Sequence, residues 1–297
     1  MELMPKVGFI GAGTVGTALA LRLSQHRYQI AAVASRNLTS AQKLAEMLNN
    51  CRICKTPQEV ADVAQFVFIT TPDDFISRVA AEIHWHVNQS VVHCSGADSV
   101  DILAPARQLG AEVGCFHPLQ TFASVSQAIS NLPGSTFAIE AEEPLLSTLK
   151  EMARALDGDY VELKAGDKVL YHAAAVFACN YVVTLVKLAT DLWQTFGVSR
   201  AQATKALVPL LRGTVNNIGS IGLPDCLTGP IARGDLGTIN RHQEALEKKA
   251  PSLLTIYKEL GLHTVPIALA KGKIDKSRAE ELQALLEIKL KDSGGQP

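Results

Sequence analysis

Side chains that can move protons gather at three places in this chain. The first is the run His-Cys-Ser-Gly-Ala at residues 93–97, and the second is Phe-His-Pro-Leu-Gln-Thr at 116–121. Imidazole suits proton transfer because its unperturbed pKa lies near the working pH of most enzymes. The third set lies on one apolar segment and consists of Lys168, Tyr171, His172 and Asn180.

The third set has a spacing that favours a functional site. At about 100° per residue, Lys168, His172 and Asn180 fall on one side of a helix. Polar side chains on an Ala- and Val-rich helix cost free energy if they are buried unpaired, so they either satisfy one another or face a site. We expect His117 to donate the proton and Ser95 to hydrogen-bond the imidazole or the substrate. A loop histidine and a turn serine remain the structural alternatives.

A phosphate-binding loop is the strongest cofactor signal. The motif G-x-G-x-x-G follows an apolar run and opens an amphipathic stretch, as Gly11-Ala12-Gly13-Thr14-Val15-Gly16. In this context the three glycines would make the tight turn, let the backbone approach a pyrophosphate, and let helix and strand pack closely. The helix N-terminus would present N–H groups to the diphosphate.

The next strand end predicts which dinucleotide is bound. An NAD site usually carries an acidic residue there, whereas this chain has Ala34-Ser35-Arg36-Asn37. A guanidinium and a hydroxyl can hold a 2′-phosphate that a carboxylate would repel, so Ser35 and Arg36 favour NADP. We also expect Thr70, Thr71 and Pro72 to line the nicotinamide side. A helix-starting turn explains those residues equally well.

The elements that must position these groups alternate between short apolar runs and amphipathic stretches up to about residue 164. That alternation predicts an α/β fold with a doubly wound, mostly parallel Rossmann sheet over residues 1–164. The predicted strands cover residues 6–10, 29–34, 66–70, 90–93, 111–116, 136–140 and 160–163, with helices at 15–25, 39–49 and 144–156.

Helical patterns take over in the remainder, which predicts an all-helical substrate and dimerisation domain over residues 165–297. The predicted helices cover 167–196, 200–218, 238–260 and 276–291, before a polar tail at 292–297. The most apolar segment, 169–189, contains His172, Asn180 and Lys187, which predicts a buried helix rather than a membrane span. Its lack of a polar face predicts a homodimer.

Composition excludes several classes of protein. The 297 residues carry 28 basic and 29 acidic side chains, and this near-neutral balance argues against nucleic-acid binding. The six cysteines include one isolated CxxC, Cys51 to Cys54, which predicts ordinary thiols, no metal site and a cytoplasmic setting without a membrane.

One more motif is a Gly- and Pro-rich turn, Leu-Thr-Gly-Pro-Ile-Ala-Arg-Gly-Asp, at 227–235. Arg233 within it could bind a substrate carboxylate, because arginine presents a planar fork of donors. The alternative interpretation is a helix start, with Asp235 or Thr238 as the cap, since both are good capping residues.

Taken together, the motifs resemble a bacterial family of Rossmann-like proteins whose C-terminal helical domain is of unknown function. The wider group contains 6-phosphogluconate dehydrogenase-like reductases, pyrroline-5-carboxylate reductase, ketopantoate reductase and prephenate dehydrogenase. The resemblance implies a nicotinamide site between two domains and a dimer. Ser95 and His117 are similar in order to the substrate-binding Ser and His of prephenate dehydrogenases. Lys168 matches the catalytic Lys of β-hydroxyacid dehydrogenases, but His172 replaces their Asn.

Two functions compete. The first is an NADPH-dependent reductase of a small 2-oxo acid, ketopantoate-like, or of a cyclic imino acid, with His172 and Asn180 orienting the substrate. The second is a non-catalytic NADP-binding sensor or redox-regulatory protein, which would need no polar convergence between domains. A deazaflavin as hydride source is a third alternative, by analogy with the wider group alone.

Overall fold

The computed structural model describes residues 5–287, so the predicted tail and the end of the last predicted helix lie outside the described residues. The chain divides into two compact units, and the boundary in the sequence falls between Asn180 and Tyr181. The first contains all the described strands and the second is helical. The boundary lies beyond the predicted residue 164 because the first helix after the sheet belongs to the first unit.

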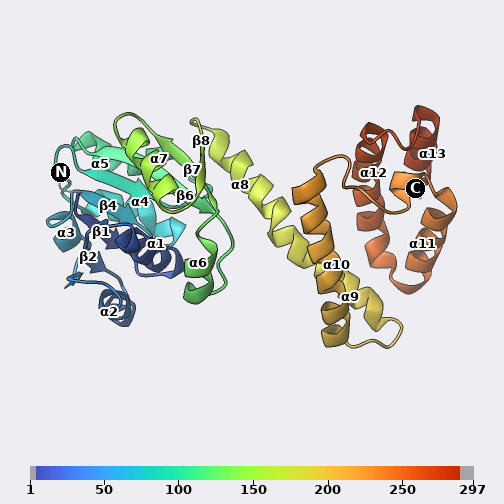
Figure 1. The fold of residues 1–297 in the computed structure, drawn as a ribbon, viewed down its shortest axis with the longest axis horizontal. Coiled ribbons are helices and arrows are strands. Elements are labelled where there is room, and N and C mark those ends of the chain that lie inside the picture. The colour runs from blue at the N-terminus through green and yellow to red at the C-terminus, as the bar shows by residue number, and fades with distance from the viewer. Residues whose placement is uncertain (1–4, 288–297) are drawn as a thin grey trace, which may run out of the picture. The chain divides into compact units, whose positions relative to one another are not determined.

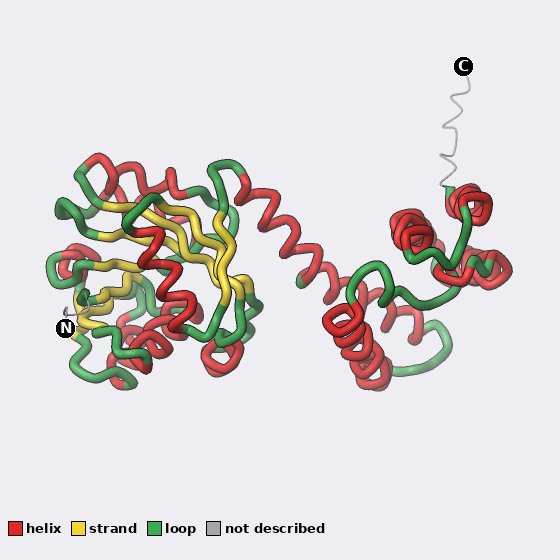
Figure 2. The backbone as a smooth tube through the Cα atoms, turned by 45° about the horizontal axis from the view of Figure 1, so that its top comes forward, coloured by secondary structure: helices red, strands yellow, loops and turns green. Residues whose placement is uncertain are grey.

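The first unit is built on one eight-stranded sheet (Figures 1 and 2). Its order is β3-β2-β1-β4-β5-β6-β7-β8, with β1 to β6 parallel and β7 antiparallel to β6. This confirms the predicted doubly wound, mostly parallel fold. The strands are β1 (Val7–Ile10), β2 (Ile30–Ala34), β3 (Arg52–Cys54), β4 (Phe66–Ile69), β5 (Ser90–His93), β6 (Glu112–Leu119), β7 (Thr136–Ala141) and β8 (Asp159–Glu162).

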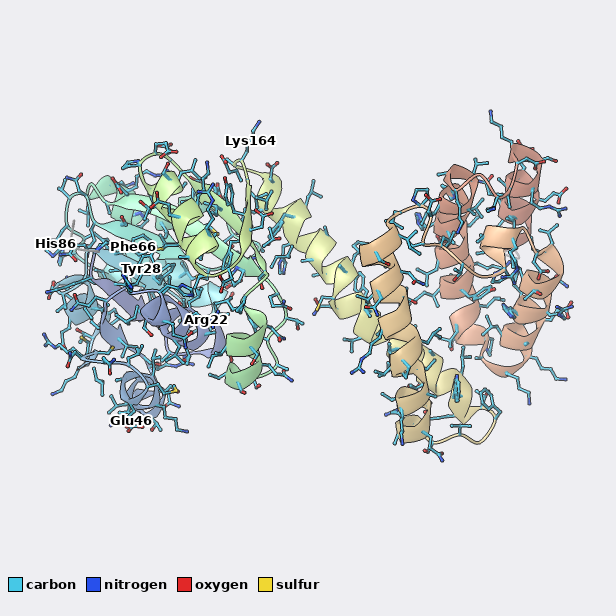
Figure 3. The ribbon with its side chains drawn as sticks, viewed as in Figure 1. Arg22, Tyr28, Glu46, Phe66, His86 and Lys164 are labelled. Carbon is cyan, nitrogen blue, oxygen red and sulfur yellow. The ribbon has the colours of Figure 1, made fainter. Side chains whose placement is uncertain are left out.

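Two hydrophobic cores cover the two faces of the sheet. Side chains of β1 and β4 are buried throughout, which explains their unbroken apolar sequences. Phe66 lies inside this layered unit, whereas Glu46 and Lys164 lie at its surface (Figure 3). One core is closed by α1 (Thr14–Gln25), α2 (Leu38–Glu46) and α7 (Leu145–Ala155), and the other by α3 (Pro57–Ala61), α4 (Asp73–Glu82) and α5 (Ala104–Gln108).

The sixth strand is longer than the sequence predicts. It continues through residue 119, so His117 lies within β6 and pairs with Ala138 of β7 rather than standing in a loop. The neighbouring β5 ends at His93, opposite Cys115. His117 therefore lies two residues beyond the end of that pairing, where the groups that follow β5 can reach it. The short α6 (Val125–Asn131) follows β6.

Two of the predicted long helices are broken. The segment 167–196 forms α8 (Asp167–Ala178) and α9 (Asn180–Gln194), separated at Cys179. The segment 238–260 forms α11 (Leu236–Lys249) and α12 (Leu254–Ala270), interrupted at Pro251, which cannot donate a helical hydrogen bond. The second unit also contains α10 (Arg200–Ile221) and α13 (Lys276–Leu286), and its core lies among α11, α12 and α13.

The apolar segment of α8 and α9 is not buried within the single chain, contrary to the prediction. Residues 167–194 are long and apolar enough to cross a membrane by length and composition, and no residue of their most apolar window is buried. The exposed fractions of Val169, Leu170 and Val183 are 67%, 77% and 70%. Such a surface on a folded chain is typical of an interface.

Candidate functional site

The turn between β1 and α1 has the geometry of a phosphate-binding loop. Gly11 has a φ of +114°, and a Cβ there would lie 2.6 Å from the backbone of Thr70. A Cβ on Gly16 would lie 2.5 Å from the carbonyl oxygen of Gly11. Gly13 differs, because a Cβ there would meet nothing within 4 Å and would project into open space. The first and third glycines therefore close the turn, and the second keeps it open.

A cavity of about 440 Å³ lies over this turn. It brings together most of the residues predicted to bind a dinucleotide, and among residues 5–287 no acidic side chain lines it. The guanidinium carbon of Arg36 lies 5.4 Å from the centre of the Phe75 ring. The cavity-lining residues that were predicted are Gly11, Ala12, Gly13, Ser35, Arg36, Thr70, Thr71 and Pro72.

Two further residues of this cavity were missed by sequence reasoning. Lys55, directly after β3, and Ser40 in α2 line the same cavity as Arg36. The strand β3 was not predicted because it has only three residues, so nothing in the sequence placed Lys55 at the sheet's carboxyl edge. The cationic side chains of Arg36 and Lys55 and the hydroxyls of Ser35 and Ser40 would suit a phosphate ester.

The threonines after β4 hold the loop and face the cavity. Thr70 Oγ1 donates to the carbonyl oxygen of Gly11 over 2.7 Å, which fixes the turn. Thr71 Oγ1 is buried and has no hydrogen-bond partner among residues 5–287. An orphaned buried hydroxyl on the wall of a cavity is a group that a bound ligand would satisfy. The loop, the cations and this hydroxyl together fit a phosphorylated dinucleotide.

A second polar cluster joins β6 to α8. His117 Nδ1 and the hydroxyl oxygen of Tyr171 are 2.8 Å apart, and their rings meet edge to face with centroids 5.7 Å apart. The His172 ring lies 6.3 Å from that of His117. The structure thus brings the two predicted histidines together. It also shows that Tyr171, a member of the third set of polar residues in the sequence, contacts His117, a partner that the sequence did not indicate.

Lys168 is the buried centre of this cluster. It is only 1% exposed, and its Nζ donates to the carbonyl oxygen of Ser95 over 2.6 Å and to Cys115 Sγ over 2.9 Å. The same Nζ lies 5.9 Å from the centre of the Tyr171 ring. Among residues 5–287, no carboxylate forms an ion pair with this ammonium group. Lys168 therefore anchors α8 to the first unit, and its position argues against direct proton donation to a substrate.

Ser95 does not reach His117. Its side chain is 2% exposed, and its Oγ lies 2.9 Å from a carboxylate oxygen of Asp73 and 2.9 Å from one of Asp98. The backbone amides of residues 97 and 98 donate to the same oxygen. These contacts hold the hydroxyl within the turn after β5, and among the described residues it forms no hydrogen bond with His117. The alternative, that Ser95 hydrogen-bonds the substrate, stays a prediction.

Gly96 is the point on which the two histidines converge. A Cβ on Gly96 would lie 2.5 Å from His172 Nδ1 and 3.0 Å from His117 Nε2. His172 Nδ1 is also buried without a hydrogen-bond partner among the described residues. Only a residue without a side chain allows both ring nitrogens to approach this turn, so the glycine of the 93–97 run is part of the site.

The environment keeps the histidines of β5 and β6 neutral. Burial, with help from the Lys168 ammonium, lowers the pKa of His117 from its usual 6.5 to about 3. The same causes lower the pKa of His93 to about 3. Burial raises the pKa of the Tyr171 hydroxyl and raises that of the Cys115 thiol to about 11. At neutral pH the cluster therefore holds uncharged imidazole, phenol and thiol around one ammonium group.

The remaining predicted residues lie elsewhere in the chain. Asn180 opens α9, after the break at Cys179, so the single helical face predicted for it with Lys168 and His172 does not exist. Arg233 belongs to the second unit, where it lines a cavity of about 390 Å³ with Lys271 and Lys273. The side chain of Asp235 caps α11 by accepting from the Thr238 amide.

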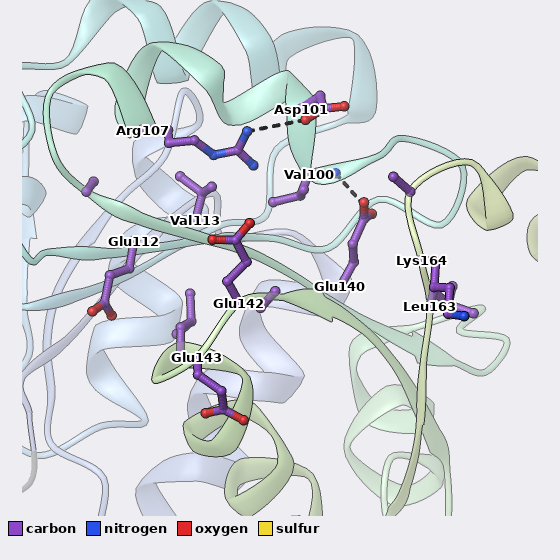
Figure 4. Close-up of a pocket in the computed structure, with 14 residues that line it drawn as sticks. Val100, Asp101, Arg107, Glu112, Val113, Glu140, Glu142, Glu143, Leu163 and Lys164 are labelled. Carbon is purple, nitrogen blue, oxygen red and sulfur yellow. Dashed lines mark hydrogen bonds and ion pairs between the residues drawn. The ribbon is translucent and has the colours of Figure 1, made fainter.

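A different cavity, of about 470 Å³, lies beside β6 and β7 (Figure 4). None of the predicted site residues lines it. Glu140 accepts from the Val100 amide over 3.1 Å, and Arg107 donates to Asp101 over 3.4 Å, as the figure shows. The first contact joins the segment after β5 to β7, and the second lies within that segment, so we assign this cavity a structural role.

Comparison with known proteins agrees with this architecture. The model of the Rossmann-like domain matches residues 3–118, and that of a domain of unknown function, DUF2520, matches residues 135–264. No curated protein matches the chain by sequence.

Three solved structures share the fold. Protein TM1727 of Thermotoga maritima is 25% identical with a TM-score of 0.71, over 90% of this chain and 99% of that one. A candidate NADP oxidoreductase, BF3122 of Bacteroides fragilis, is 24% identical with a TM-score of 0.70, over 89% and 98%. A 1-pyrroline-5-carboxylate reductase of Streptococcus pyogenes is 16% identical with a TM-score of 0.60, over 95% and 99%.

Proposed function

We propose that this chain, which matches the models of a Rossmann-like domain and of the DUF2520 domain, is an NADP-dependent oxidoreductase. Its substrate would be a small 2-oxo acid, ketopantoate-like, or a cyclic imino acid. The single observation that carries the proposal is the cavity over the β1–α1 turn, which Arg36 and Lys55 line and to which the described part of the chain contributes no acidic side chain. A carboxylate at this wall would select NAD by accepting from the ribose hydroxyl, whereas two cations favour a 2′-phosphate.

Different residues of the chain would bind the cofactor and transfer the proton. The amides of the Gly11–Gly16 turn and of the α1 N-terminus would bind the diphosphate, and Arg36 with Lys55 the 2′-phosphate. When bound, a reduced nicotinamide supplies a hydride for a carbonyl or imine carbon. His117 would then provide the proton, with His172 orienting the substrate.

Names of the structural relatives support the reaction class. One is described as an NADP oxidoreductase and another as a reductase of a cyclic imine that bears a carboxylate. Three cationic side chains around the second unit's cavity, Arg233 among them, would suit such a carboxylate. We propose a homodimer in which a second copy covers the exposed apolar surface of α8 and α9.

The test is a screen for NADPH oxidation. Purified protein is mixed with NADPH and with a panel of 2-oxo acids and cyclic imines, and absorbance at the nicotinamide band is followed. For a turned-over compound, His117→Ala should lower kcat by about 10²–10⁴ without changing NADPH affinity, and His172→Ala should mainly raise KM. The reverse pair of phenotypes would make His172 the proton donor.

The alternative, a non-catalytic NADP-binding sensor, predicts a different result. Such a protein would bind NADPH but oxidise it with none of the panel, and neither histidine variant would change any measured property of the cofactor complex. The histidines that converge on Gly96 favour the enzyme, because a sensor has no need of uncharged proton-carrying groups beside a backbone turn.

A further inference from the structure

We propose that Tyr171 acts through His117 as its proton source, so that a neutral imidazole can serve as the donor without ever becoming an imidazolium ion. The inference rests on the proposed reductase function. It concerns a residue pair that joins β6 of the sheet to α8, and its main observation is the 2.8 Å contact between the Tyr171 hydroxyl and His117 Nδ1.

The direction of this hydrogen bond follows from the two groups. A phenol is a better donor than a neutral imidazole N–H, and an imidazole lone pair is a better acceptor than a phenol oxygen. Tyr171 keeps its proton because burial raises its pKa. The Tyr171 O–H therefore donates to His117 Nδ1, and the single imidazole proton is left on Nε2. Tyr171 thus fixes the tautomer of the catalytic histidine.

The other ring nitrogen of His117 lies beside the turn that follows β5. His117 Nε2 faces the turn at Gly96, where a Cβ would come within 3.0 Å of it. Because the glycine has no side chain, the Nε2–H group remains free to donate toward a carbonyl oxygen or an imine nitrogen. A neutral imidazole in this state is a hydrogen-bond donor, as in other enzymes that use uncharged histidine as an electrophile.

The proton transfer balances in two linked steps. Once the substrate carbon has gained its hydride, the electron pair of the former double bond resides on the substrate oxygen or nitrogen. That atom takes the proton from His117 Nε2, so the Nε2–H bond breaks and a new O–H or N–H bond forms. His117 Nδ1 takes the proton of the Tyr171 hydroxyl at the same time, which leaves a phenolate. The starting state returns when the Nδ1 proton moves back to the phenolate and Nε2 takes a proton from water, which leaves as hydroxide.

A charged group near the Tyr171 ring is Lys168. Its Nζ lies 5.9 Å from the centre of the Tyr171 ring, with two short contacts that hold it there. The other titratable groups around His117 are His172 on α8, His93 on β5 and Cys115 on β6, and none of these three is a carboxylic acid. The carboxylates of Asp73 and Asp98 lie at Ser95 Oγ, in the turn after β5. The negative charge that arrives with the hydride would therefore end beside a fixed positive charge.

The chain offers a matched control for this pair. In the second unit, His242 Nδ1 and the Tyr257 hydroxyl are 2.9 Å apart, with rings edge to face and centroids 5.9 Å apart. Tyr257→Phe removes the same kind of contact as Tyr171→Phe, away from the β6–α8 cluster. Melting temperatures of both variants show whether either change simply prevents folding.

The deciding experiment is nitrogen-15 NMR on the full-length protein labelled in histidine, without any ligand. We expect the His117 signals, assigned with a His117→Gln variant, to show a neutral ring protonated on Nε2 between pH 5 and 8. Tyr171→Phe should mix the two tautomers, while Tyr257→Phe should leave His117 unchanged. A wild-type ring protonated on Nδ1, or an unchanged tautomer in Tyr171→Phe, overturns the proposal.

A kinetic readout separates this proposal from the proposed function. With a compound that the NADPH screen identifies, Tyr171→Phe should lower kcat by about 10- to 100-fold and leave KM and the NADPH Kd within twofold. An unchanged kcat overturns the proton transfer while the reductase stands. Absence of any NADPH binding or turnover in wild type overturns the reductase, whereas the NMR result still decides the tautomer.

Discussion

At the scale of single residues, the proposed preference for NADP depends on Arg36. Its guanidinium lies over Phe75 on the cavity wall, where a charge-assisted bond to a 2′-phosphate would form. Arg36→Ala should weaken NADPH binding by roughly 1.5–3 kcal/mol and leave NADH binding unchanged. Fluorescence titration of both cofactors measures this, with Arg107→Ala at the other cavity as control. Equal affinities of the wild-type protein for NADPH and NADH would contradict the assignment.

Acid stability follows from the buried histidines. The pKa values of His93 and His117 are lowered to about 3 in the folded chain, so between pH 6.5 and 3 the unfolded chain binds more protons. The contribution of these two histidines to the free energy of unfolding is therefore fully present above pH 6.5, and it is lost as the pH falls from 6.5 to 3. Urea unfolding from pH 8 to pH 4 should show this loss, at up to about 1 kcal/mol per pH unit for each histidine.

The variant His117→Gln provides the check on that cause. It removes one of the two groups whose proton binding differs between the folded and unfolded chains. The slope of unfolding free energy against pH should therefore be smaller in the variant below pH 6.5. An identical slope in both proteins would mean that other groups control the acid sensitivity.

At the scale of elements, the β1–α1 turn separates folding from binding. Gly13→Ala adds a methyl group that touches nothing within 4 Å, so the melting temperature should change little. The same methyl group would occupy the space through which a diphosphate approaches the backbone, and NADPH affinity should fall at least tenfold, which is more than about 1.4 kcal/mol. Unchanged NADPH affinity in this variant would mean that the cofactor does not lie against the turn.

The turn after β5 gives a second prediction at this scale. Gly96→Ala should displace the His172 and His117 rings, because its Cβ would lie 2.5 Å and 3.0 Å from their nitrogens. We expect a large loss of kcat with NADPH binding preserved. Gly237→Ala, at an exposed helical position whose nearest outside atom would lie 3.7 Å away, is the control. Full activity in Gly96→Ala would exclude both histidines from the reaction.

Much of this arrangement could be predicted from sequence because the patterns are local. The glycine spacing at 11–16 and the apolar runs of β1 and β4 each have one physical reading, and the structure agrees with it. The run of β6 through His117 could not be predicted, because the pairing that extends it comes from β7. The contacts of Ser95, Tyr171 and Lys55 likewise depend on segments distant in sequence.

At the scale of the whole molecule, the exposed apolar helices demand a partner. Leu170 and Val183 are 77% and 70% exposed in the single chain, and a surface of this kind is costly in water. We expect light scattering at tens of micromolar protein, about the range in which obligate dimers stay associated, to give twice the chain mass. The double variant Leu170→Glu, Val183→Glu should then be monomeric or poorly folded.

The outcomes of that experiment are distinct. A wild-type monomer that remains stable in plain buffer would contradict the homodimer. A protein that requires detergent, and returns to aggregates when detergent is removed, would indicate that the segment 167–194 meets lipid instead, as its length and composition allow.

The two outermost strands of the sheet restrict how two chains can meet. Unpaired edge strands invite another chain to extend the sheet, and proteins block this with short strands and charged side chains. Here β3 has three residues and carries Arg52, while β8 has four and carries Asp159 and Glu162, the latter 2.6 Å from Lys150. Sheet-to-sheet polymerisation is thus disfavoured at both ends. Assembly is left to helical surfaces, which can close into a finite pair.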